Sequence, residues 1–541
     1  MRARGSGAYA GLAAGLVVLA AVLRFWGLTT GLPHPLTRPD EEVMLVHLAG
    51  PARGDFDLRY AVYPSLYFYV TWAWSALVLG AAGVVGVLPR ASLRDTLAAH
   101  PEHVLLVARA LSASAATLTV PLVMALTRAS FGRGAALLAG GLLATNLLHV
   151  RDAHAAKPDA LLTLGVTAAL ALAAGAARAP ARRRWAALGA VIGLATGIKY
   201  PALLLLAPAW VAAIEGSRRT GWRRLLANDV WLVGAVAGVT FVATSPYLLL
   251  NPETRRAVLG VFGSIFPSLF PSLVPAALPP ALLAMTPARQ WWSGYAYHLT
   301  VSLRYGAGLL PTVLAAPALV WGCVASTAMG RIAAAWIVVY FTVHGLSPML
   351  LSRYMTPLLP ALFVLEAGLL MAMLRRLAES WRIPLGVGVA SALVAVPLLH
   401  CIAYDRLLAR PDTRNLATEW LAAHAEPGAR VLVAGTVFWG YGEPLMPAGV
   451  EKLRLQAGAT ELPAGVDFVL AHDHPTFASR FDPASLAPFA DRLRLVLDLD
   501  PFVGPRDGAL FEEFDAYYVP LDGFGVVERT GPRVRIYAVD G

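Results

Sequence analysis

The sequence predicts a polytopic α-helical membrane protein with a small α/β domain at its C-terminal end. Hydrophobic residues make up 57% of the 541 residues and charged residues only 14%, and the mean hydropathy is +0.59. A soluble chain of this length carries roughly 25% charged residues. The apolar residues form long runs separated by short arginine-rich loops, a pattern typical of helices that cross a bilayer. After about residue 405 short strand-like segments replace these runs.

The apolar runs predict about 11 to 13 transmembrane helices, of which eleven can be placed along the chain. We place them at residues 8–28, 103–127, 134–152, 159–177, 185–199, 200–216, 229–250, 307–328, 331–346, 355–374 and 384–402. The basic loops at 128–133, 178–184, 218–224 and 375–382 then all face the cytoplasm, and the C-terminal segment lies outside it. The run at 66–88 would reverse this sidedness as a crossing, so we expect a re-entrant or interfacial helix there.

Charge and cysteine content exclude two classes of function. The formal net charge of +10 comes from arginines in the short loops, so it indicates membrane sidedness and no nucleic-acid partner. Cys323 and Cys401 both fall in apolar runs, which argues against a disulfide framework or a cysteine zinc site. The N-terminus, with Arg2 and Arg4 before a long apolar stretch, is predicted to be an uncleaved signal anchor.

Two domains are predicted, a membrane domain over residues 1–403 and a soluble extracytoplasmic α/β domain over 404–541. The first outer loop spans 29–65, and a second, at 251–306, is rich in proline and aromatic residues. The second loop fits a partly embedded flap or a plain aromatic belt that includes Trp291 and Trp292. In the C-terminal domain we expect a helix at 412–425 and strands that begin near residues 430, 467 and 533. It contains no phosphate-binding glycine motif.

The most informative polar feature is the acidic pair Asp40-Glu41, which directly follows the first crossing. A carboxylate at the membrane surface can accept a proton from a hydroxyl beside a lipid-borne substrate. The alternative is a solvated helix start after Pro39, where the helix dipole favours acidic residues.

Other ionisable residues lie at the ends of apolar runs, where charges are expensive. The turn at 151–159 carries Asp152, His154 and Asp159, and Lys199-Tyr200 and Arg353-Tyr354 lie in two further turns. Any one of these positions fits a side chain that reaches to the interface. In the predicted topology, however, they all share the outer face with Asp40. Acids and bases gathered on one face suit transfer from a lipid phosphate.

These residues stand in an order that resembles the GT-C superfamily of membrane glycosyltransferases, which includes protein O-mannosyltransferases and the aminoarabinose transferases of lipid A. The matching residues are Arg24 with Gly27-Leu28, Pro39-Asp40-Glu41, Tyr63-Pro64-Ser65-Leu66-Tyr67, Arg109, Phe131-Gly132, His154 to Asp159, Gly193 to Tyr200, Ser245-Pro246-Tyr247 and Arg353 to Pro360. No single match is specific, but the ordered series from Arg24 to Pro360 is.

The resemblance implies a polyprenyl-phosphate-linked sugar as donor and chemistry on the extracytoplasmic face. Asp40 would be the catalytic carboxylate, Glu41 its neighbour and Asp159 a second acid of the site. The residues expected to bind the carrier phosphate or substrate are His154, Lys199, Tyr200, Arg353, Tyr354 and Tyr63. Some relatives bind a divalent metal ion; no ligand spacing in this sequence decides that question, and no other cofactor is implied.

The predicted function is therefore an inner-membrane glycosyltransferase that passes a sugar to an extracytoplasmic lipid, polysaccharide or protein, with inversion at the anomeric carbon. One alternative is a multi-pass transporter, since broken helices and buried charges also line transport paths. No internal repeat supports it. The other alternative is a catalytically inactive family member that acts as a partner.

Overall fold

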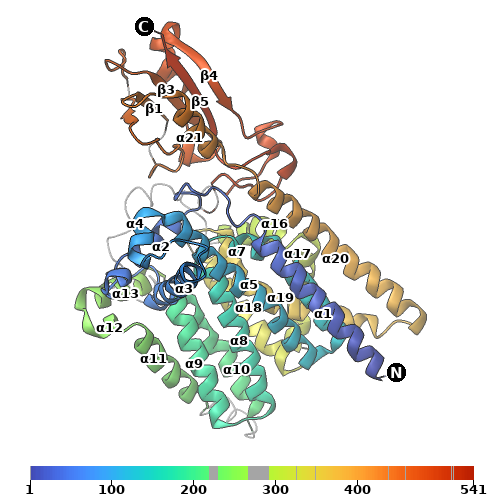
Figure 1. Cartoon of the computed structure of the whole chain (residues 1–541). Coiled ribbons are helices and arrows are strands. Elements are labelled where there is room, and N and C mark those ends of the chain that lie inside the picture. Colours follow the sequence, from blue (N-terminus) through green and yellow to red (C-terminus); the bar gives the residue numbers. More distant parts are fainter. Residues whose placement is uncertain are drawn as a thin grey trace. The chain divides into compact units, whose positions relative to one another are not determined.

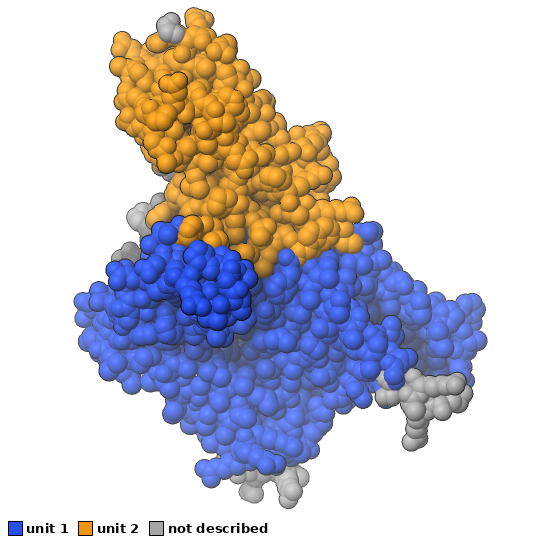
Figure 2. All heavy atoms as spheres, in the orientation of Figure 1, with its two compact units in different colours: residues 1–25, 44–99, 107–401 blue, residues 26–43, 100–106, 402–541 orange. Residues whose placement is uncertain are grey.

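The computed structural model describes residues 2–217, 229–265, 292–324, 326–347, 349–435, 438–456, 458–512, 515 and 517–540. The basic loop at 218–224 and Trp291 lie outside these residues. The chain divides into two compact units, shown in different colours in Figure 2. The membrane unit comprises residues 1–25, 44–99 and 107–401, and the C-terminal unit comprises 26–43, 100–106 and 402–541.

Helices account for nearly all of the regular structure before residue 425 (Figure 1). In chain order they are α1 (Arg2–Phe25), α2 (Glu41–Leu48), α3 (Ser65–Val84), α4 (Leu93–Ala99), α5 (Pro101–Phe131), α6 (Arg133–Ala144), α7 (Leu147–Ala153), α8 (Asp159–Arg178), α9 (Arg182–Ile198), α10 (Leu206–Gly216), α11 (Asp229–Thr244), α12 (Tyr247–Leu250), α13 (Pro252–Ile265), α15 (Ser293–Tyr297), α16 (Arg304–Gly306), α17 (Leu309–Val324), α18 (Ala328–Gly345), α19 (Leu359–Leu374), α20 (Glu379–Leu408) and α21 (Thr413–His424).

The described residues include seven helical segments that are long and apolar enough to cross a membrane. They are Gly7–Phe25, Ser65–Val84, Pro101–Phe131, Asp159–Arg178, Ala328–Gly345, Ser352–Leu374 and Glu379–His424. Shorter apolar helices lie at Arg133–Ala144, Tyr200–Gly216, Asp229–Thr244 and Leu309–Val324. These segments confirm the predicted multi-pass membrane protein.

Two predicted runs take a different form in the structure. The run at 134–152 is divided between α6 and α7, because the Asn146 side chain accepts a hydrogen bond from the His149 backbone N–H and caps α7. The run at 66–88, expected as a re-entrant or interfacial helix, forms the continuous 20-residue helix α3, which is long enough to cross. A helix without a break lacks the reversal that a re-entrant segment needs, so the structure excludes the re-entrant form and leaves an interfacial helix or a crossing.

In the membrane unit, α9 packs between α8 and α11 (Figure 1). Three glycines four residues apart, Gly189, Gly193 and Gly197, form the face of α9 that lies against α11. A Cβ atom at Gly193 would lie 2.5 Å from the Ala237 carbonyl oxygen, so only glycine permits this approach. Small residues at this spacing are a common way of bringing membrane helices close together. α9 ends at Ile198, so this contact also sets the position of Lys199.

The C-terminal unit contains a five-stranded sheet with the order β2-β1-β3-β5-β4. The strands are β1 (Arg430–Ala434), β2 (Glu451–Arg454), β3 (Phe468–Asp473), β4 (Leu493–Leu499) and β5 (Arg533–Val539). β1 pairs in parallel with β2 and β3, whereas β5 is antiparallel to β3 and β4. Helix α21 covers one face through Ala417 and Leu421, and a 3₁₀ helix at Pro483–Arg492 covers the other. This confirms the predicted small α/β domain.

Candidate active site

The acidic pair lies where the first outer loop turns into α2. Asp40 has a left-handed backbone, with φ of 69°, and is half-buried, whereas the Glu41 side chain is fully buried. The Thr37 hydroxyl donates a hydrogen bond to Glu41 Oε2 over 3.0 Å. Glu41 begins α2, so the acidic helix start considered from the sequence is present. The structure adds the conformation of Asp40, which a helix start does not require.

A left-handed backbone at a residue other than glycine costs roughly 1–2 kcal/mol, although aspartate tolerates it better than most residues. Such strain persists only where the surroundings impose it, and it concentrates at functional sites. The surroundings of Asp40 therefore hold it in this conformation, while Glu41 is buried and hydrogen-bonded to Thr37 within the same turn.

In the membrane unit, Asp159 and Lys199 form a buried ion pair. Lys199 Nζ donates to Asp159 Oδ1 over 2.7 Å, and the two side chains are 10% and 2% exposed. Asp159 is the first residue of α8, and Lys199 follows the last residue of α9. The second carboxylate oxygen of Asp159 is buried and has no hydrogen-bond partner among the residues that the structure describes. A buried oxygen of this kind is costly unless it receives a donor.

Two tyrosine rings lie close to the lysine ammonium. The Lys199 ammonium is 5.8 Å from the ring centre of Tyr63 and 5.1 Å from that of Tyr354. Both distances are within the range of a cation–π interaction, which strengthens where water is excluded. Four of the predicted site residues are therefore brought together in one cluster, which we name the Lys199 cluster: Tyr63, Asp159, Lys199 and Tyr354.

The other predicted site residues of the membrane unit are His154, Tyr200 and Arg353. All three are buried and lie close in the chain to members of the Lys199 cluster. Arg353 directly precedes Tyr354 and is 5% exposed. The Tyr200 hydroxyl donates to the Ala61 carbonyl oxygen over 2.9 Å, so Tyr200 has a structural contact with the segment that leads to Tyr63. His154 is fully buried, and its Nδ1 lies 2.8 Å from the Val150 carbonyl oxygen, which orients the ring. Asp152 accepts a hydrogen bond from the Thr356 hydroxyl.

Tyr441 is not among the site residues predicted from the sequence. It lies in the C-terminal unit together with Asp40 and Glu42. Burial raises the pKa of the Tyr441 phenol, and the neighbouring carboxylates of Glu42 and Asp40 raise it further. Tyr441 therefore stays protonated at neutral pH and faces the acidic turn with a neutral hydroxyl. It is 400 residues away in the chain, and only the fold brings it there.

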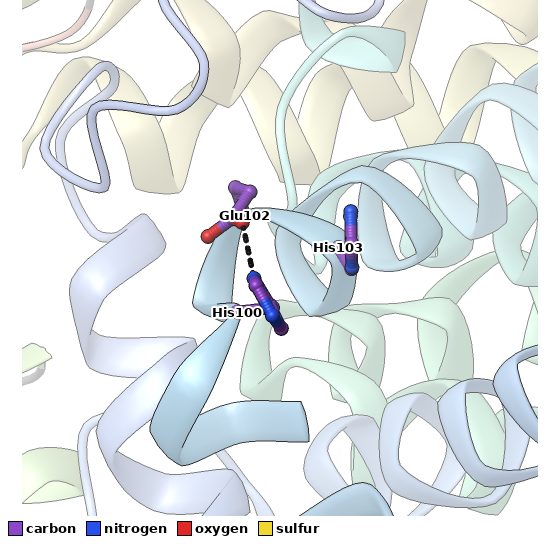
Figure 3. A group of neighbouring side chains, drawn as sticks. All are labelled: His100, Glu102 and His103. Carbon is purple, nitrogen blue, oxygen red and sulfur yellow. Dashed lines mark hydrogen bonds and ion pairs between the residues drawn. The ribbon is translucent and has the colours of Figure 1, made fainter. Parts of the chain in front are cut away.

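The structure also contains a group of side chains of the types that bind metal ions, His100, Glu102 and His103, near the start of α5 (Figure 3). Their ligand atoms all lie within 4.8 Å of one another, and His100 Nδ1 is 3.1 Å from Glu102 Oε1. The two imidazoles are stacked, with planes inclined by 28° and centres 5.1 Å apart. A metal ion lies in the plane of each imidazole that binds it, so one ring would have to turn before both could share an ion.

Comparisons with known proteins give one family and several solved structures. A family model described as dolichyl-phosphate-mannose-protein mannosyltransferase matches residues 101–249. A search of curated proteins finds no match. The Archaeoglobus fulgidus oligosaccharyltransferase in a complex with zinc and sulfate is 12% identical, with a TM-score of 0.54 over 98% of this chain and 88% of that one.

Two further solved structures are similar. The oligosaccharyltransferase AglB from Archaeoglobus fulgidus, in complex with an inhibitory peptide and a dolichol-phosphate, is 13% identical, with a TM-score of 0.52 over 86% of this chain and 69% of that one. ArnT from Cupriavidus metallidurans is 18% identical, with a TM-score of 0.47 over 98% of each chain. The chain therefore has the fold of the two oligosaccharyltransferase structures, whose TM-scores exceed 0.5, and this fold agrees with the resemblance inferred from the sequence.

Proposed function

We propose that the protein is an integral-membrane glycosyltransferase that moves a sugar from a polyprenyl phosphate to an acceptor on the extracytoplasmic face. The observation that carries this proposal is the Lys199 cluster, a cation held in a buried site by Asp159 and two tyrosines. Such a cation suits a leaving phosphate, and the family match over residues 101–249 lies across Asp159 and Lys199. AglB has been solved with a dolichol-phosphate, a carrier of the proposed class.

In the proposed reaction Asp40 accepts the proton of the acceptor hydroxyl. The acceptor oxygen attacks the anomeric carbon from the side opposite the phosphate, and the bond between that carbon and the phosphate oxygen breaks. One direct displacement of this kind inverts the configuration. The carrier phosphate leaves with an additional negative charge, which Lys199 and Arg353 stabilise. Glu41 holds the turn at Asp40, and Asp159 holds Lys199.

The test compares lipid-linked sugars in cells that lack the protein with those in cells that carry only Asp40→Asn. We expect one polyprenyl-phosphate sugar to accumulate in both strains, and mass spectrometry of the extracted lipids identifies it. Asp55→Asn, at an exposed acid of the same outer loop, is the control and should restore the normal lipid profile. Accumulation in the deletion strain alone would remove Asp40 from the chemistry, and no accumulation in either strain would favour a transporter or an inactive partner.

A further inference from the structure

The loop that carries the acidic pair is joined to the C-terminal domain by two consecutive side chains of α21. Asn415 Nδ2 donates hydrogen bonds to the carbonyl oxygens of Gly31, over 3.0 Å, and Leu32, over 2.9 Å. Arg414 Nη1 donates to the Leu36 carbonyl oxygen over 2.8 Å. Residues 26–43 accordingly belong to the C-terminal unit, although they precede it by almost 400 residues in the chain.

The Arg414 side chain makes several further contacts within the C-terminal unit. Its Nε and Nη2 atoms donate to the two carboxylate oxygens of Asp412, over 2.8 and 2.9 Å, and both side chains are 1% exposed. The guanidinium lies 4.9 Å from the ring centre of Tyr518. Its Nη1 atom also donates to the Tyr441 carbonyl oxygen over 2.7 Å. A paired, forked guanidinium in this setting has a single orientation, so it fixes the position of the Leu36 carbonyl.

A histidine provides a third connection between the loop and the domain. The Leu36 backbone N–H donates to His34 Nδ1 over 3.1 Å, so that nitrogen carries no proton. The other ring nitrogen therefore carries the proton and donates to the Glu443 carbonyl oxygen over 2.8 Å. Burial and the charge of Arg414 lower the pKa of His34 to about 3, so the imidazole keeps this neutral form at neutral pH.

The contacts then continue along the loop to the acidic turn. Gly31 has φ of +70°, and the space where its Cβ would lie is filled by the Thr37 side chain. The Thr37 hydroxyl donates to Glu41, the residue after Asp40. A continuous series of packed groups thus leads from Asn415 through Gly31 and Thr37 to the left-handed turn at Asp40.

We propose that the C-terminal domain acts as a positioning element of the active site, and that Asn415 and Arg414 hold the loop in the conformation that places Asp40. The inference rests on the proposed function for the role of Asp40, while the attachment of the loop can be measured without any activity. Asn415 and Arg414 are positioning residues, since neither is proposed to touch the substrate.

The test uses full-length protein in detergent and compares Asn415→Ala with Thr418→Ala. Thr418 lies one turn further along α21, and its hydroxyl donates only within the domain, to the carbonyl oxygens of Arg414 and Leu445. We expect Asn415→Ala to raise amide hydrogen exchange in residues 28–37 by about tenfold. We also expect it to lower kcat by about tenfold while the Kd of the polyprenyl-phosphate sugar stays unchanged. Thr418→Ala should change none of these quantities.

Each outcome decides a separate point. Unchanged exchange in residues 28–37 of the Asn415→Ala variant would overturn the attachment, whatever its activity. Faster exchange with an unchanged kcat would overturn the positioning role. A matching rise in exchange throughout β1 and β3 would show that the domain had unfolded, and Arg414→Lys, which keeps the charge but loses the fork, then repeats the test. If the unaltered protein transfers no sugar, the proposed function fails while the exchange result stands.

Discussion

Lys199 and Asp159 are separated by 40 residues in the chain, yet they form one buried pair. Breaking a buried pair by removing one partner typically costs about 3–5 kcal/mol, because the other charge remains buried without compensation. Replacing both partners with neutral groups is far less costly. Single and double variants of the pair can therefore distinguish its contribution to the free energy of unfolding from the contribution of Lys199 to donor binding.

We expect Lys199→Met to lower the free energy of unfolding by about 3 kcal/mol and to weaken donor binding. The Asp159→Asn/Lys199→Met double variant should regain most of the stability, because no buried charge is left, but none of the donor affinity. Thermal unfolding in detergent and equilibrium binding of a polyprenyl-phosphate sugar measure the two quantities. Recovery of donor affinity in the double variant would show that Lys199 serves only to neutralise Asp159.

At the scale of single residues, the sequence indicated which residues belong to the candidate site better than it indicated which residues they contact. Asp159, Lys199 and Tyr354 could be selected because charged and aromatic residues are conspicuous at the ends of apolar runs, and Tyr63 could be selected through the family resemblance. The hydrogen bonds of His34 and Arg414 could not be foreseen, because their partners are backbone carbonyl oxygens, which every residue has. The proximity of Tyr441 to Asp40 follows only from the fold.

Among the helices, the α9–α11 contact connects packing directly to the candidate site. Gly193 is packed against the backbone of α11, and Lys199 follows the end of α9. Gly234 and Gly238 of α11 itself have no atom within 4 Å of the place where a Cβ would lie. A glycine-to-alanine substitution can therefore be compared at a packed position, Gly193, and at a position with free space, Gly238, of the same helix pair.

We expect Gly193→Ala to lower the free energy of unfolding by about 1–3 kcal/mol, since the added methyl group must push α11 away. Donor affinity should fall with it, because the displacement of α9 moves Lys199. Gly238→Ala should leave donor affinity unchanged and raise stability slightly, by up to about 1 kcal/mol, through the better helix propensity of alanine. Thermal unfolding and donor binding check both variants. An unperturbed Gly193→Ala protein would contradict close packing of α9 on α11.

Hydropathy predicted where helices occur but not every break between them. The apolar runs at 159–177 and 384–402 correspond to α8 and to the middle of α20. The division of the run at 134–152 depends on a single cap, the hydrogen bond to the Asn146 side chain, which a hydropathy average cannot detect. The same limit applies to 66–88, where sidedness was argued from loop charges and the structure shows an unbroken helix.

At the scale of the whole molecule, the C-terminal unit combines three distant stretches of the chain. A reading along the sequence assigns residues 26–43 to a membrane loop, because they stand between apolar runs. They are instead hydrogen-bonded to side chains of α21 and to the loop after β1. Such an arrangement depends on pairings between residues almost 400 positions apart, for which a single sequence contains no signal.

This unit also encloses three histidines that are neutral when the protein is folded. Burial lowers the pKa of His34 to about 3, with the charge of Arg414 adding to the effect. Burial likewise lowers the pKa of His472 to about 4 and that of His474 to about 3. In the unfolded chain each histidine titrates near its ordinary pKa of about 6.5. Between that pH and the folded values, unfolding therefore takes up protons.

We expect the stability of the C-terminal unit to be constant above about pH 7 and to fall as the pH decreases from about 6.5 toward 4. Each histidine contributes up to about 1.4 kcal/mol per pH unit, so three approach about 4 kcal/mol per unit. Amide exchange in β3 and β5 of the full-length protein, corrected for intrinsic rates, measures this slope. His472→Met should reduce the slope by about a third, whereas His424→Gln, at an exposed position of α21, should leave it unchanged.

A flat profile of stability against pH would contradict the burial of these imidazoles. A slope that also appears in residues 28–37 would show that the loop at Asp40 loses its support together with the domain, because His34 belongs to both.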